Sequence, residues 1–121
     1  MATVTATKDN FEQLIKENDI VFFDFWAAWC GPCMRFGPVY EAAAETHKDV
    51  VFAKVDTEDQ PQLQAQFGIR GIPTLMVFRE QIGIMQQAGA LPAEGLEDVI
   101  GKVKELDMED VRKQIAAEEP K

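Results

Sequence analysis

The chain has 121 residues, 46% of them hydrophobic and 27% charged, which predicts one globular domain with a substantial core and excludes a disordered chain or a disulfide-dense miniprotein. Acidic residues outnumber basic ones by 21 to 12, and this net charge of −9, without any basic cluster, argues against binding to nucleic acid or to an anionic membrane. The longest apolar run, residues 25–30, is far shorter than the roughly 20 residues of a membrane-spanning helix.

The first half of the chain predicts alternating helices and strands. Apolar residues at helical spacing within residues 11–15 predict a helix, and the aromatic and β-branched run at residues 20–26 predicts a strand covered on both faces. A helical pattern starts at Cys30, and residues 50–55 again predict a buried strand. A strand, a helix and a strand in this order form a unit of parallel strands with a right-handed crossover. The fold class is therefore α/β.

The second half of the chain adds an antiparallel edge. A short helix around residues 63–67 is followed by apolar runs at residues 74–78 and 83–87, whose close spacing predicts a hairpin. Apolar residues at helical spacing within residues 96–103 predict a further helix, and a weaker pattern follows Asp107. The central sheet is therefore expected to be mixed.

The only two cysteines, Cys30 and Cys33, lie at the predicted junction of a strand and a helix. A helix N-terminus carries a partial positive charge that lowers the pKa of a thiol there, so Cys30 is the predicted nucleophile toward a disulfide. Cys33 follows one turn later on the same helix face, where it can attack the mixed disulfide and release the reduced substrate. The pair predicts thiol–disulfide exchange.

Two other interpretations of the cysteine pair are weaker. A zinc site needs more ligands than this chain offers, because it has no other cysteine and a single histidine, His47. A structural disulfide across so short a loop constrains the unfolded chain little. The N-terminus lacks the basic and apolar regions of an export signal, so we expect a cytoplasmic protein, and the cytosol keeps structural disulfides reduced. We therefore expect no bound metal.

Asp24 interrupts the first apolar strand shortly before Cys30. Burial raises the pKa of a carboxyl, so Asp24 is the predicted general base, taking the proton of Cys33 through a water molecule. The alternative is an aspartate turned to solvent or hydrogen-bonded to the backbone. Lys54, in the neighbouring predicted strand, pairs with Asp24 or extends to solvent. Pro73 precedes a strand and is a weak candidate for a cis peptide bond.

Two separated segments carry a family resemblance. Residues 25–33, Phe-Trp-Ala-Ala-Trp-Cys-Gly-Pro-Cys, and residues 68–74, Gly-Ile-Arg-Gly-Ile-Pro-Thr, resemble the thioredoxin family. The resemblance extends over roughly residues 3–106. Further positions that agree in order and spacing are Asp24, Pro38, Lys54, Gly89 and Ala90.

The resemblance implies a thioredoxin fold, with a mixed central sheet of about five strands flanked by helices on both faces. Residues 1–106 would form the thioredoxin domain. Residues 107–121 lie beyond the usual family end and are expected to form a helical extension that packs on the domain or trails from it. The alternative for this extension is an arm that docks to a dedicated partner.

The resemblance also implies an activity, that of a protein-disulfide reductase. Thioredoxin reductase would regenerate the dithiol, and the flavin and NADPH would reside on that partner, so we expect this chain to be a monomer without a bound cofactor. One alternative is a dedicated disulfide oxidase or isomerase, against which Gly31 and Pro32 between the cysteines argue. The other is a non-catalytic binding module that uses the hairpin and the C-terminal tail.

The resemblance assigns supporting roles around Cys30 and Cys33. The peptide bond before Pro73 would be cis and lie against the cysteines. The residues expected to support the active site are Trp26, Trp29, Gly31, Pro32 and Pro73. An extended substrate segment would pair with the chain by β-augmentation in a shallow apolar groove. The residues expected in this groove are Trp29, Gly71, Ile72, Pro73, Gly89 and Ala90.

Three features depart from the family pattern. Met34 stands where the family usually has lysine or arginine. Residues 79–83, Arg-Glu-Gln-Ile-Gly, lack the Asn-Gly or Asp-Gly of a tight hairpin, so we expect a longer or bulged turn. Thr57 and Ala88 stand where the groove often has larger aliphatic residues, which predicts a smaller contact area with substrates.

Overall fold

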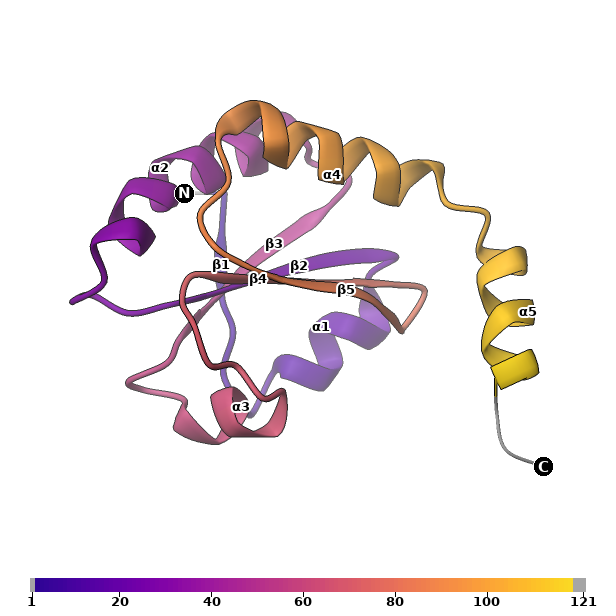
Figure 1. Ribbon diagram of the computed structural model, residues 1–121, viewed down its shortest axis with the longest axis horizontal. Coiled ribbons are helices and arrows are strands. Elements are labelled where there is room, and N and C mark those ends of the chain that lie inside the picture. Colours follow the sequence, from indigo (N-terminus) through magenta and orange to yellow (C-terminus); the bar gives the residue numbers. More distant parts are fainter. Residues whose placement is uncertain (1, 119–121) are drawn as a thin grey trace.

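A five-stranded mixed sheet runs through the centre of the protein in the computed structural model, which describes residues 2–118 (Figure 1). Its strand order is β1-β3-β2-β4-β5. β2 pairs in parallel with β3 and antiparallel with β4, while β1 is parallel to β3 and β5 antiparallel to β4. The strands are β1 (Val4–Thr5), β2 (Ile20–Trp26), β3 (Val51–Asp56), β4 (Thr74–Arg79) and β5 (Ile82–Ala88). The predicted mixed α/β sheet is confirmed.

Helices cover both faces of this sheet (Figure 1). α2 and α4 lie on one face and α1 and α3 on the other, while α5 lies beyond the turn that joins β4 to β5. The helices are α1 (Phe11–Glu17), α2 (Gly31–Thr46), α3 (Pro61–Gln66), α4 (Ala93–Glu105) and α5 (Met108–Glu118). Within residues 2–118, no helix is long and apolar enough to cross a membrane.

Alternate residues of β2 enter two separate cores, as the pleat of a strand dictates. Phe22 packs in the core under α2 and α4, together with Tyr40 and Leu96. Phe23 and its odd-numbered neighbours pack in the other core, which α1 and α3 cover. The same alternation places Asp24 on the α2 face, directly beneath the helix that carries the cysteines.

Two features differ from the sequence prediction. β1 was not predicted, because it has two residues and both are exposed, so no apolar pattern marks it. The expected longer hairpin turn was wrong, since only Glu80 and Gln81 separate β4 from β5. Both adopt the left-handed conformation, with φ of 51° and 69°, which is the geometry of a tight turn normally built from Asn-Gly. A bulge does occur, but within the strand pairing at Val77 and Phe78.

Candidate active site at the Cys30–Cys33 pair

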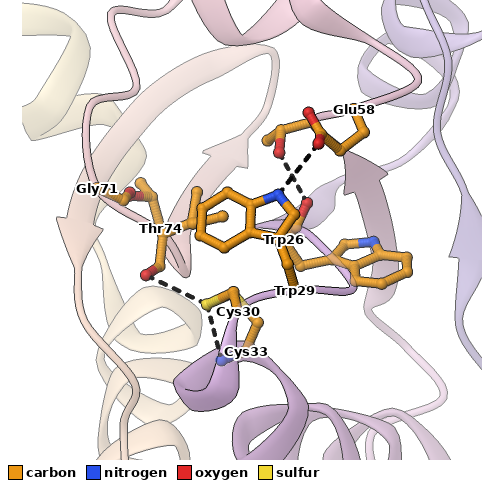
Figure 2. The surroundings of a disulfide bond; sticks show 9 residues. Trp26, Trp29, Cys30, Cys33, Glu58, Gly71 and Thr74 are labelled. Atoms are coloured by element: carbon orange, nitrogen blue, oxygen red, sulfur yellow. Dashed lines mark hydrogen bonds between the residues drawn. A yellow bond between two sulfur atoms is a disulfide. The ribbon is translucent and has the colours of Figure 1, made fainter.

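Cys30 and Cys33 form a disulfide where β2 passes into α2 (Figure 2). Cys30 is the N-cap of α2 with extended backbone, and Pro32 occupies the first turn, where its missing N–H is not needed. The backbone N–H of Cys33 points at Sγ of Cys30, at 3.2 Å. Cys30 is 5% exposed and Cys33 is 1% exposed. The partial positive charge of the helix N-terminus therefore acts on Cys30, and Cys33 is the more buried of the two cysteines.

The loop before β4 lies against Cys30. Sγ of Cys30 is 3.6 Å from the carbonyl oxygen of Ile72, and the peptide bond between Ile72 and Pro73 is cis. Gly89 donates its N–H to the carbonyl of Pro73 at 2.8 Å, and its φ of 106° is a conformation that side chains disfavour. The structure thus brings Ile72, Pro73 and Gly89 together beside the cysteines. Gly71 is exposed at the start of this loop, and Ala90 is exposed after Gly89.

Trp26 ends β2 and Trp29 directly precedes Cys30, and the two side chains differ in environment. Trp29 is 70% exposed, and its Nε1–H donates to Oε1 of Glu58 at 3.1 Å (Figure 2). Trp26 is half-buried, and its ring lies 4.7 Å below Nζ of Lys54. Sequence reasoning missed Glu58. The available signal was its position just after a strand parallel to β2, since the carboxyl ends of parallel strands meet at one edge.

Asp24 is fully buried beneath α2, with 0% exposure. Neither of its carboxylate oxygens has a hydrogen-bond partner among the described residues. Burial raises the pKa of Asp24 from 3.8 to about 7, and the positive charge of Lys54 opposes that rise. Lys54 is the direct register partner of Asp24 on β3. The structure thus brings the two predicted residues together and gives Asp24 a pKa suited to proton transfer near neutral pH.

A cavity of about 610 Å³ lies behind Cys33, between α2, β1 and the end of β3. Cys33, Trp26 and Lys54 line it, together with Glu41 and Asp56. The cavity therefore leads from the buried cysteine past Lys54 to exposed residues of β1. Sequence reasoning did not identify Glu41 or Asp56 as part of the site, because their juxtaposition depends on how α2 crosses the sheet.

The departures from the family pattern lie around this site. Met34, immediately after Cys33, is 44% exposed. Arg35 lies close to Gly31: a Cβ atom at position 31 would be 3.4 Å from Nη1 of Arg35. The expectation that Thr57 belongs to the groove surface was wrong: Thr57 is only 3% exposed, and its hydroxyl donates to the carbonyl of Trp26. Ala88 is exposed at the end of β5.

Comparison with known proteins shows the family to which this chain belongs. The thioredoxin family model matches residues 2–102. The chain belongs to the thioredoxin family. A putative thioredoxin 2 of Streptomyces coelicolor is 56% identical over 118 residues, which cover 98% of this chain and 88% of that protein. A thioredoxin of Alicyclobacillus acidocaldarius is 45% identical over 103 residues, which cover 84% of this chain and 98% of that protein.

Solved thioredoxin structures show the same fold. A mutant thioredoxin from Halobacterium salinarum NRC-1 superposes with a TM-score of 0.80 at 32% identity, covering 86% of this chain and 92% of that one. The oxidised thioredoxin from Plasmodium falciparum gives a TM-score of 0.75 at 30% identity, covering 84% of this chain and 97% of that one.

Thioredoxins are thiol–disulfide oxidoreductases, and this chain has that activity through its Cys-Gly-Pro-Cys disulfide. Thioredoxins carry no bound cofactor. Membership of the family implies substrates that carry disulfides and a reductase as partner. In residues 2–118, no three His, Cys, Asp or Glu side chains gather in a way that could hold a metal ion. A dedicated oxidase or a non-catalytic binding module is not favoured.

Proposed function

We propose that this thioredoxin reduces protein disulfides by a two-step exchange in which Cys30 attacks and Cys33 resolves. The observation that carries the proposal is the difference between the two sulfur atoms. Cys30 caps α2 and receives the Cys33 N–H, which stabilises its thiolate, whereas Cys33 is only 1% exposed. A low-pKa outer thiol and a protonated inner thiol are what an ordered exchange needs.

In the first step, the Cys30 thiolate attacks one sulfur of the substrate disulfide. A mixed disulfide forms, and the other substrate sulfur leaves as a thiolate. In the second step, Asp24 accepts the proton of Cys33 through water, and the Cys33 thiolate attacks Sγ of Cys30. The second substrate thiolate leaves and the Cys30–Cys33 disulfide closes, so two electrons have passed to the substrate.

The remaining residues support Asp24 and the two cysteines. Lys54 is proposed to stabilise the ionised form of Asp24, which its positive charge favours. Trp26 shields Asp24 and Lys54 from bulk water, because its ring lies against Lys54. Gly31 and Pro32 form the first turn of α2, and Pro73 places the Ile72 carbonyl beside Cys30.

The groove is proposed to bind an extended substrate segment by backbone hydrogen bonds. The Ile72 carbonyl lies next to the reacting sulfur, where it can accept an N–H from a substrate strand. Trp29 offers a large exposed apolar surface, and the exposed Gly71, Gly89 and Ala90 leave room for a strand to approach. This arrangement suits substrates without a fixed side-chain sequence, since the backbone carries the recognition.

A flavin-containing thioredoxin reductase that draws on NADPH is the proposed electron donor, and the cytoplasm is the proposed site of action of a monomer. The acidic surface, with a net charge of −9, fits neither nucleic acid nor an anionic membrane as partner. Residues 1–106 are proposed to be the catalytic domain, and residues 107–121 an extension without a catalytic role.

Trapping of the mixed disulfide tests the proposal. Reduced Cys33→Ser should accumulate a covalent complex with a disulfide-bearing protein such as insulin, and added dithiol should release it. Cys30→Ser should form no such complex and should lack NADPH-dependent turnover with thioredoxin reductase. Equal trapping by both variants would contradict the ordered roles.

A further inference from the structure

The cavity behind Cys33 is bounded on its outer side by the N-terminal segment of the chain. Thr3, Val4 and Thr5 line it there, and α2 lines it from Cys33 to Glu41. β1 is a short boundary: its two residues pair with β3, and the N–H of Ala6 adds one backbone hydrogen bond to the Lys54 carbonyl at 2.9 Å. Before Val4, the segment is held by contacts with α2.

Glu41 supplies two of these contacts. Its Oε1 accepts the backbone N–H of Ala2 at 2.6 Å, and its Oε2 accepts the hydroxyl of Thr3 at 2.7 Å. Both bonds join parts of the chain that are 38 and 39 residues apart. The same bonds lower the pKa of Glu41, so the carboxylate stays ionised and remains a strong acceptor. Glu41 thus fastens the N-terminal segment to the helix across the cavity.

We propose that Glu41 is a positioning residue for the exchange reaction: by holding Thr3 at the cavity and its neighbour Ala2 against α2, it limits the water that reaches Lys54 and Asp24. The proposal rests on the role assigned to Asp24 above. It deepens that role, because it names the distant contact that limits hydration of the Asp24 carboxyl and so keeps its titration near neutral pH.

The surroundings of Asp24 make it sensitive to water in this cavity. Its oxygens have no hydrogen-bond partner in residues 2–118, so water that reached them would add to the stabilisation that Lys54 gives the ionised form. Leu75 is its register partner on β4 and brings no charge from that side. The titratable or charged groups that face Asp24 or line the cavity are Lys54, Tyr40, Cys33, Glu41, Asp56 and Asp59.

Lys54 links the cavity to Asp24. It lines the cavity, its Nζ lies 4.7 Å from the centre of the Trp26 ring, and it would be 3.9 Å from a Cβ on Gly37. Water admitted past β1 would therefore reach Lys54 first and Asp24 next. Added water would stabilise the carboxylate and move its titration to lower pH.

Two pairs of variants separate this role from a merely structural one. Glu41→Ala removes both hydrogen bonds, and Thr3→Val removes one while keeping the side-chain shape. Glu41→Gln is the matched control for charge, because its amide can still accept from Ala2 and donate to the Thr3 hydroxyl. Glu45→Ala is the matched control for position, since Glu45 is exposed on the same helix.

The first readout is the titration of the Asp24 carboxyl carbon, followed by NMR in the oxidised full-length protein. We expect Glu41→Ala and Thr3→Val to lower the midpoint by at least about half a pH unit, and Glu41→Gln and Glu45→Ala to leave it within about 0.2 unit. Unchanged midpoints in Glu41→Ala and Thr3→Val, with or without a loss of stability, would overturn the proposal.

The second readout is the pH profile of the resolution step, measured with a mixed disulfide between Cys30 and a chromogenic thiol. Glu41→Ala should shift this profile to lower pH and speed resolution about twofold or more at one pH unit below the wild-type midpoint. Asp24→Asn separates the two claims: if it keeps the wild-type profile, the proposed base is wrong, and the carbon titration still decides the role of Glu41.

Discussion

Lys54 is the register partner of Asp24, yet its ammonium group lies over the ring of Trp26, 4.7 Å from the ring centre. Within residues 2–118 no ion pair or hydrogen bond joins the two side chains, and both oxygens of Asp24 are left without a partner. The positive charge acts on the carboxyl through space and lowers its pKa by less than burial raises it. Asp24 therefore stays protonated up to about pH 7 in the folded protein.

Asp24→Asn should flatten the pH dependence of stability. The pKa of Asp24 is about 7 in the folded protein against 3.8 when exposed, so the folded state binds more protons between these values. Stability is then greatest below the unfolded pKa and falls as the pH rises through the folded pKa. Between pH 5 and pH 8 the ionisation of Asp24 should lower the free energy of unfolding of the wild type by about 3 kcal/mol. Asp24→Asn should not show this loss.

Urea unfolding of the oxidised wild type and Asp24→Asn at both pH values measures this difference, and the other titrating groups cancel in the comparison. Parallel pH dependences in the two proteins would show that Asp24 is not protonated in the native state.

Gln81→Gly should stabilise the protein by about 1 kcal/mol. Gln81 has a φ of 69° in the two-residue turn between β4 and β5, a conformation that glycine adopts without steric cost. Gln87→Gly is the matched control, because Gln87 is exposed within β5 and glycine weakens an extended strand. The midpoint of urea unfolding should rise for Gln81→Gly and fall for Gln87→Gly. A loss of stability in Gln81→Gly would contradict the left-handed turn.

Arg79→Gln should destabilise the protein by about 2–3 kcal/mol. Nη1 of Arg79 donates to three carbonyls at the C-terminal end of α4, those of Val103, Lys104 and Leu106. The last carbonyls of a helix lack their regular intrahelical partners, and here, among the described residues, only Val103 also accepts a backbone N–H, that of Leu106 at 3.4 Å. A positive charge at this end also interacts favourably with the helix dipole. Disulfide reduction should be unchanged, because Arg79 ends β4 at the edge opposite Thr74 and the cysteines.

Arg112→Gln serves as the control for Arg79→Gln. Arg112 is half-exposed and pairs with Glu80 at 2.6 Å, and such surface pairs contribute less than about 1 kcal/mol. Equal losses of unfolding free energy in the two variants would show that Arg79 does not cap α4.

Deletion of residues 108–121 should leave disulfide reduction within about twofold of wild type while lowering stability by about 2 kcal/mol. α5 buries Met108 and contacts the hairpin through Arg112 and Glu80, far from the cysteines. The Alicyclobacillus thioredoxin aligns over 98% of its own length with only 84% of this chain. The shortened chain should therefore still fold. Turnover with insulin and thioredoxin reductase measures the effect, and a large loss of turnover in a folded protein would assign α5 a role in the reaction.

The sequence predicted the elements whose side chains carry a strong pattern. β2 has buried residues on both faces, and Cys30 sits where that strand gives way to a helix, so both could be read from residue types and spacing. The position of Asp24 within an apolar strand likewise pointed to a buried carboxyl, because the alternation of a strand fixes which face each residue takes.

Other features depend on contacts between distant segments and left no local signal. Val4 and Thr5 both favour strands, but β1 is two residues long and exposed, so its pairing with the edge of β3 left no burial pattern in the sequence. The tight turn at Glu80 and Gln81 forms against local preference, held by the pairing of β4 with β5 and by a hydrogen bond from the Glu80 N–H to Asp19. The contact of Glu41 with Ala2 and Thr3 likewise follows from how α2 crosses the sheet.

The reduction potential of the Cys30/Cys33 couple tests the central claim most directly. Equilibration of the full-length protein with a defined thiol buffer, followed by alkylation of the free thiols, gives this potential. A disulfide reductase predicts a value of about −270 mV, the level that characterises thioredoxins, so that electrons flow from this chain to disulfides of higher potential. A value of about −120 to −180 mV would mean that the chain accepts electrons from substrates, and it would contradict the account.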